Sequence, residues 1–219
     1  MNNKSSKFAL TIFGIMILLM IIIGNGDRIE STSSMADVRT TFKKVIDNYD
    51  WQRSNMEQVF EEGKNSLMNF KEAIRVARDK YAEFGKVYDR WEYVEKEIDK
   101  LRVRYDELVK GADEFYSEIE TTANSITDPE LRSASLRRMQ KHRNKYYLRL
   151  RDTESKISVL NVGVVKVTDT VKALEINYTL NVVDETIYQT FQEIDTMITE
   201  VMPELEKLTA ESKELLSTL

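Results

Sequence analysis

The chain has 219 residues, of which 32% are charged, only 7 are glycine and only 2 are proline, a composition typical of long helices with few loops. The net charge of -5 disfavours a general nucleic-acid binder. The absence of cysteine excludes disulfides, cysteine-bound zinc, a thiol nucleophile and a lipid-modified N-terminal cysteine.

Residues 8–23 form an uncharged apolar run, FALTIFGIMILLMIII, which two lysines precede. A membrane-spanning helix needs about 17–25 apolar residues, and residues 8–24 reach the lower end of that range. A cleaved signal peptide is the alternative, but residues 24–26 make a poor cleavage site and residues 34–36 lie rather far from the apolar core. The sequence therefore favours an uncleaved anchor.

The lysines predict that the N-terminus stays in the cytoplasm and that the rest of the chain is exported. Residues 1–24 are then a cytoplasmic stub and transmembrane anchor (or signal peptide). Residues 25–36 are a polar linker, and residues 37–219 form an extracytoplasmic helical domain. This division predicts a single-pass protein of the bacterial inner (cytoplasmic) membrane, with its main body in the periplasm.

From Phe42 onward, apolar residues are spaced alternately three and four apart, which is the spacing of one helix face in a left-handed coiled coil. One series runs from Phe42 to Phe84 and includes Tyr81. The next is unbroken and consists of Trp91, Val94, Ile98, Leu101, Tyr105, Leu108, Ala112, Phe115 and Ile119. Because a single stripe must pack on neighbours, we expect an all-α fold. It would comprise an N-terminal transmembrane helix followed by an elongated antiparallel helical bundle or coiled coil of three to four long helices.

Gly85 leaves one connection open, since it either makes a turn or lies inside a continuous helix over about residues 37–126. A glycine costs only about 1 kcal/mol in a helix interior. No cluster of proline, asparagine or aspartate marks a turn there, so the sequence favours a continuous or kinked helix and three long helices rather than four. If the chain does turn, the following helix runs back toward the membrane.

The clearest break is SITDPEL at residues 125–131, where Asp128 is suited to cap a helix and Pro129 to begin one. The helix that follows carries its stripe as far as Tyr178 and would be roughly 75 Å long at ~1.5 Å per residue. Both signals together predict a sharp connection between two long helices.

Polar residues at 177–185 predict the end of that helix, because Asn181 and Asp184 can stop and restart a helix. A last helix then carries apolar residues at the same spacing over about residues 187–215. Pro203 lies inside it and removes a backbone hydrogen bond, so we expect a kink there.

His142 is the single histidine, and its helical neighbours at 138, 139, 145 and 146 are not metal ligands. The scattered glycines form no phosphate-binding loop, and the many carboxylates are those expected of solvated helix faces. We therefore predict no catalytic, metal or cofactor-binding residues, and a protein that is not an enzyme.

The start of the helix after Pro129 is strongly basic. Its cations are Arg132, Arg137, Arg138, Lys141, Arg143, Lys145, Arg149 and Arg151. Three interpretations are open: charge matching with the acidic last helix, contact of all but Arg143 with anionic lipid or another polyanion, and, least favoured, nucleic acid. Arg143 and Thr153 occupy stripe positions, where polar residues specify register or oligomeric state.

Three segments carry a resemblance: FYSEIETTANSITDPELRSASLRRMQKHRNKYYLRL, ISVLNVGVVKVTDTVKALEINYTLNV and FQEIDTMITEVMPELEKLTAE. Over roughly residues 105–212 the chain resembles an uncharacterised bacterial family of coiled-coil envelope proteins, a domain of unknown function. Similar proteins often look like lipoproteins, and this chain departs from them because it has no cysteine. The resemblance implies an extracytoplasmic helical protein and transfers no catalytic residue.

The features together predict a non-enzymatic, membrane-anchored structural or interaction protein of the bacterial cell envelope, such as a scaffold, spacer or assembly factor. The alternative is an extracytoplasmic sensor or transport-accessory domain that acts through a partner protein. Expected partners are the membrane, through the N-terminal anchor, and a second copy or other envelope proteins, through the coiled-coil faces. No nucleic-acid partner, small-molecule substrate or cofactor is expected.

Overall fold

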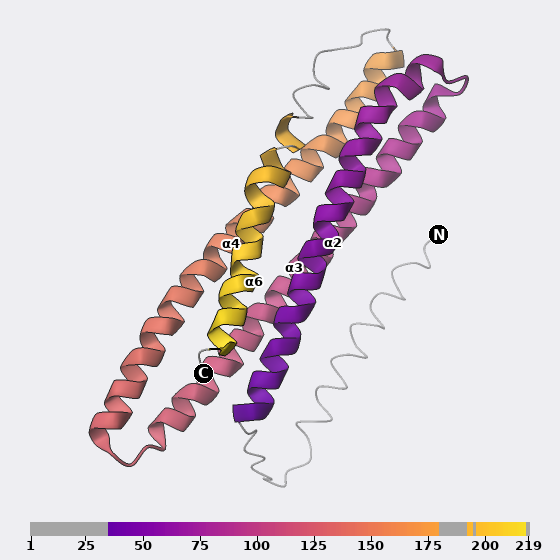
Figure 1. Cartoon of the computed structure of the whole chain (residues 1–219). Helices are drawn as coiled ribbons and strands as arrows, with labels where there is room; N and C mark the ends of the chain where they lie inside the picture. Colours follow the sequence, from indigo (N-terminus) through magenta and orange to yellow (C-terminus); the bar gives the residue numbers. More distant parts are fainter. Residues whose placement is uncertain (1–34, 180–191, 195, 218–219) are drawn as a thin grey trace, which may run out of the picture. The chain divides into compact units, whose positions relative to one another are not determined.

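The computed structural model describes residues 35–179, 192–194 and 196–217. The chain divides into two units, Met1–Ser33 and Ser34–Leu219, and all the described residues lie in the second. Figure 1 shows its helices, which are α2 (Met35–Val76), α3 (Lys80–Asn124), α4 (Pro129–Thr179), the π-helical turn η1 (Met197–Val201) and α6 (Met202–Ser217). The described ranges contain no strand, which confirms the all-α prediction.

Two predictions concern segments that the structure does not describe. The expected membrane anchor at residues 8–24 lies outside the described residues, and so do residues 181 and 184, where a turn is expected. Within the described ranges, no helix combines the length and the apolarity that crossing a membrane requires.

The continuous helix that the sequence favours is wrong. α2 ends at Val76, and α3 begins only a few residues later at Lys80. Asp79 caps α3, because its carboxylate accepts a hydrogen bond from the Ala82 amide at 3.1 Å and its own backbone is extended. Gly85 lies inside α3, so the turn exists but falls before the glycine.

The rings at the two ends of this hairpin show that α2 and α3 run antiparallel. Next to the turn, the centroids of Phe70 and Phe84 lie 4.8 Å apart. At the other end, Phe42 stacks on Phe115 with centroids 4.9 Å apart. The pairing therefore extends along both helices, and the described chain contains four main helices rather than three.

α4 begins as the sequence predicts. Asp128 accepts hydrogen bonds from the amides of Glu130 (2.8 Å) and Leu131 (3.0 Å), and Pro129 is the first helical residue. α4 runs back along α3, where the Tyr105 hydroxyl donates to the Leu150 carbonyl at 2.8 Å. As Figure 1 shows, the α3–α4 connection lies at the same end of this unit as the start of α2.

α6 lies against both α2 and α4. Lys213 contacts the Asp50 carboxylate on α2 at 2.6 Å, and the hydroxyls of Ser212 and Tyr146 on α4 lie 2.7 Å apart. The disturbance expected at Pro203 takes the form of the π-helical turn η1 just before it. The helical run continues from η1 into α6 without a break, so Pro203 lies inside it, and the π-helical turn is where the helix accommodates the missing amide hydrogen.

The unbroken stripe that begins at Trp91 forms the centre of the core, since every member through Phe115 is buried. Tyr81, in contrast, is 62% exposed, because the helix ends before it and the register restarts at Lys80. Ile46 and Phe60 are buried although they lie off the predicted stripe. The buried arc of α2 is wider than one stripe because both α3 and α6 cover it.

Candidate interaction surfaces

The basic start of α4 presents three faces with different surroundings. Toward α3, Arg143 pairs with Glu120 at 3.7 Å and its guanidinium lies 5.5 Å from the centre of the Tyr147 ring. Toward α6, the Arg149 guanidinium contacts the Glu211 carboxylate at 3.0 Å and Glu204 at 3.7 Å. Cations on these two faces are therefore engaged within the protein.

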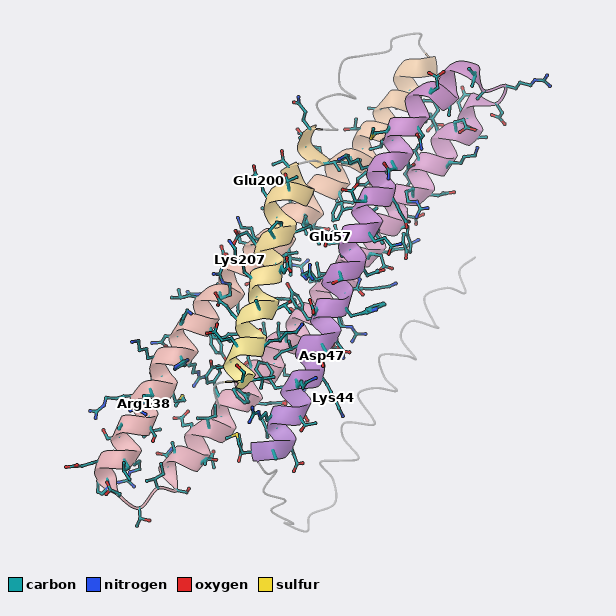
Figure 2. The ribbon with its side chains drawn as sticks, in the orientation of Figure 1. Lys44, Asp47, Glu57, Arg138, Glu200 and Lys207 are labelled. Carbon is teal, nitrogen blue, oxygen red and sulfur yellow. The ribbon has the colours of Figure 1, made fainter. Side chains whose placement is uncertain are left out.

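The third face of α4 points to solvent. Arg137, Arg138 and Lys141 are exposed there, and Lys145 is exposed at its border with the cavity between α4 and α6. None of the four has an ion-pair partner among the described residues. Figure 2 shows Arg138 in the part of α4 near the α3–α4 connection. We call these four residues the basic face. Of the other cations predicted for polyanion contact, Arg132 is half-buried and Arg151 is exposed farther along α4.

Arg149 is separate from the basic face, although the sequence groups it with the others. Its hydrogen bonds to Glu211 raise its pKa above the ordinary value for arginine, and Asp152 and Glu204 add to the effect. Two guanidinium N–H groups of Arg149 donate to the same Glu211 oxygen, and a charge-assisted contact of this kind holds two helices in register. Arg149 therefore joins α4 to α6, as charge matching would predict.

The two polar stripe residues differ in their surroundings. Arg143 is half-buried at the edge of the α3–α4 contact, where it forms an ion pair with Glu120 and a cation–π contact with Tyr147. Thr153 is buried, and its hydroxyl has no hydrogen-bond partner among the described residues. A buried unpaired hydroxyl is destabilising, so Thr153 contributes less to stability than an apolar residue of the same shape would.

A second surface lies along α2 and α3, over a buried carboxylate. Glu97 on α3 is 2% exposed and accepts hydrogen bonds from Gln52 (2.9 Å), Asn55 (2.9 Å) and Lys100 (2.5 Å). Burial alone would raise the pKa of Glu97, but the donors Lys100, Gln52 and Tyr93 outweigh it and hold the pKa below its ordinary value. Glu97 is therefore an ionised structural group that fixes the two helices against each other.

Exposed apolar and aromatic side chains surround this carboxylate. A groove of about 570 Å³ lies on the α2–α3 surface. Its rim carries Trp51, Val103 and Tyr93, which are 66%, 54% and 41% exposed. We call it the α2–α3 groove. Tryptophan and tyrosine exposed on rigid helices are typical of protein contact sites.

Sequence reasoning did not find this groove, because it followed the buried stripe. Gln52 takes the stripe position, and Trp51 precedes it on the solvent side of α2. The signal available was a tryptophan outside the apolar spacing of an amphipathic helix. The Gln52–Glu97 contact that forms the floor joins residues 45 apart in the chain, so no local pattern reveals it.

Three further polar side chains, Tyr116, His142 and Tyr146, lie around a small cavity between α4 and α6. His142 is exposed and lies beside Tyr116 and Lys145 at this cavity, which has a volume of about 90 Å³. Burial raises the pKa of Tyr116 and of Tyr146, so both hydroxyls stay neutral near pH 7. The described ranges contain no group of three or more histidine or carboxylate side chains placed to hold a metal ion.

The fold and these surfaces define a class of protein: a long, antiparallel, all-helical domain with a basic helix face and an aromatic-rimmed groove. Residues 28–219 match the model of the family described as Protein of unknown function (DUF2959), and the chain belongs to that family. The match covers most of the chain and extends the resemblance seen over residues 105–212. No curated protein and no solved structure shows a significant match to it.

Proposed function

We propose that this protein is a non-enzymatic interaction protein of the bacterial cell envelope, which binds a partner protein in the α2–α3 groove. The observation that carries the proposal is the exposed Trp51 beside Tyr93 and Val103. Hydrogen bonds to the buried Glu97 hold the floor of the groove in place. A partner therefore meets a preformed site, and little conformational entropy is lost on binding.

The groove favours binding over catalysis. A general acid or base works best when its pKa lies near the operating pH, and the donors around Glu97 move its pKa in the opposite direction. Because Glu97 stays ionised, it has no proton to give, and its oxygens already accept hydrogen bonds from Gln52, Asn55 and Lys100. Its role in the proposal is to position Trp51 and Tyr93.

The proposal places the domain outside the cytoplasm, held by a single-pass anchor at residues 8–24. Its support is the apolar run that follows two lysines in the sequence. The helical domain would then serve as a scaffold, spacer or assembly factor, because a 51-residue helix such as α4 reaches about 75 Å.

A photo-cross-linking residue at position 103, in full-length protein in native membranes, tests the partner. We expect a discrete set of envelope proteins to be captured. Trp51→Ala should abolish the capture, because truncating a central aromatic contact weakens binding by about 2 kcal/mol or more, roughly 30-fold. Met68→Ala is the matched control, since Met68 is also exposed on α2. Capture that survives Trp51→Ala unchanged would contradict the proposal.

A second copy of the chain is a further candidate partner. α4 carries exposed apolar side chains at Val159, Val162 and Val165, away from the groove. Apolar residues grouped on one helix favour association. Light scattering on the full chain in detergent should then give a dimer or larger assembly, whereas a monomer at micromolar concentration would exclude this partner.

A further inference from the structure

The charge of this protein is unevenly distributed. The chain carries a net charge of -5, yet no aspartate or glutamate occurs between Glu130 and Asp152, a stretch that contains eight arginines and lysines. A concentration of cations within an acidic protein marks a surface that meets a polyanion, unless neighbouring acids neutralise it.

Neighbouring acids neutralise only part of this stretch. Arg143 forms an ion pair with Glu120 on α3, and Arg149 forms ion pairs with Glu204 and Glu211 on α6. The basic face consists of Arg137, Arg138, Lys141 and Lys145, which are exposed and have no ion-pair partner among the described residues. Lys145 lies at its border, because it also lines the small cavity beside Glu211 and Glu214 of α6. Arg137, Arg138 and Lys141 therefore remain for a ligand outside the domain, with Lys145 at the border toward α6.

The place of the basic face within the domain favours one class of ligand. Near the start of α2, the Phe42 ring stacks on Phe115 and lies 6.3 Å from the Tyr146 ring, measured between centroids. The first turns of α4, which precede Tyr146, thus lie at the end of the domain where α2 begins (Figure 1). The chain before α2 contains the apolar run of residues 8–23. A bilayer that held this run would be the nearest large polyanion.

We propose that the basic face of α4 binds the headgroups of anionic phospholipids in the membrane that holds the N-terminal anchor. Lysine and arginine near an anionic bilayer each strengthen contact by about fivefold in the binding constant, and the effect fades within a Debye length. Leu131, exposed at 62% in the first turn of α4, supplies an apolar contact with the interface. The proposal rests on the anchor in the proposed function and adds the lipid class that the domain recognises.

The absence of cysteine allows a clean test on the full chain. A single cysteine at Ser133, exposed beside the basic face, is labelled with a fluorophore, and the protein is reconstituted into vesicles that contain headgroup-bound quencher. We expect strong quenching in vesicles of phosphatidylcholine with phosphatidylglycerol, weak quenching in phosphatidylcholine alone, and loss of the difference at high salt.

Two charge-reversed proteins separate the basic face from net charge. The test protein carries Arg137→Glu, Arg138→Glu, Lys141→Glu and Lys145→Glu. The control carries the same charge change far from the α3–α4 connection, as Arg78→Glu, Lys86→Glu, Lys166→Glu and Lys172→Glu. We expect the test protein to lose most of the quenching and the control to keep it. A glutamine version of the test protein, with helix content checked by circular dichroism, gives the same answer with less repulsion.

Two other results would overturn the proposal. Equal quenching in both lipids would mean that α4 approaches the bilayer whatever the charge of its lipids. No quenching in either lipid would mean that α4 contacts another macromolecule. Alkaline carbonate extraction distinguishes these failures from failure of the anchor. A chain that stays in the vesicles with an unquenched label refutes lipid recognition alone, whereas a released chain refutes the membrane anchor of the proposed function.

Discussion

Two glycines inside helices show how packing decides the effect of a single atom. A Cβ atom at Gly63 on α2 would lie 3.2 Å from the Trp91 ring and 3.3 Å from a Val94 methyl group. A Cβ atom at Gly85 on α3 would meet nothing within 4 Å. Gly63 therefore lets the two helices approach at the buried tryptophan, and Gly85 has no such role.

The two alanine variants should consequently differ in their effect on stability. Gly85→Ala is expected to raise the free energy of unfolding by about 1 kcal/mol, because alanine favours the helix and has room. Gly63→Ala gains the same helix propensity, but overpacking costs typically 1–3 kcal/mol, so the net effect is neutral to destabilising. Chemical denaturation of the full chain in detergent, followed by circular dichroism, measures both. A stabilised Gly63→Ala would contradict the close α2–α3 contact.

Glu97 predicts a pH dependence of stability. Its pKa in the folded protein lies below the ordinary value of 4.5, so its ionised form stabilises the fold. This contribution is fully present above pH 4.5 and is lost as the pH falls through the lowered pKa. Glu97→Gln should thus cost roughly 1–3 kcal/mol near pH 7, and the difference from the unmodified protein should shrink in acid. A difference that is constant with pH would contradict an ionised Glu97.

At the scale of helices, a single apolar stripe predicts only part of the surface that each helix buries. The stripe from Trp91 to Phe115 is buried as predicted, but α3 contacts both α2 and α4 and also buries Glu97 and Tyr116 off that stripe. On α2 the same rule missed Ile46 and Phe60, since two helices cover α2 and a single stripe describes only one contact.

The turn between α2 and α3 was missed for a different reason. Asp79 is a single capping residue without a proline or glycine beside it, and the apolar spacing continues through it to Phe84. Only the contacts between distant residues, such as Phe42 with Phe115, distinguish a hairpin from a continuous helix. The same holds for the α2–α3 groove, whose floor joins Gln52 to Glu97.

The contact between α4 and α6 predicts how firmly the whole of α6 is held against the domain. Arg149 is the residue of α4 that contacts both Glu204 and Glu211, and these side chains are only about a quarter exposed. Arg149→Gln should weaken the docking of α6 by about 1 kcal/mol, because a charge-assisted contact is lost. Hydrogen exchange across Met202–Ser217 should then become faster while α3 stays protected.

Lys207→Gln is the matched control for this experiment. Lys207 pairs with Glu204 within α6 itself, so its loss does not separate α6 from α4. Exchange in α6 that rises equally in both variants would show that α6 responds to surface charge in general and is not held by Arg149.

At the scale of the whole molecule, one turn decides where the functional surfaces lie. Because the chain returns at residues 77–79, the α3–α4 connection comes back to the start of α2, and the basic face lies toward that same end of the domain. A continuous helix would have carried the basic face away from it. The lipid proposal and the proposed orientation of the domain both depend on this return.

The most direct test of that return is a distance between two spin labels. Cysteines at Thr41 and Ser117, exposed on α2 and α3, can be introduced into the full chain because it has no cysteine of its own. The hairpin predicts labels within roughly 20 Å, since packed helix axes lie about 8–10 Å apart. A continuous helix would separate the two positions by about 115 Å at ~1.5 Å per residue. Pulsed electron paramagnetic resonance in membranes should therefore show the short distance, and a signal without it would contradict the account.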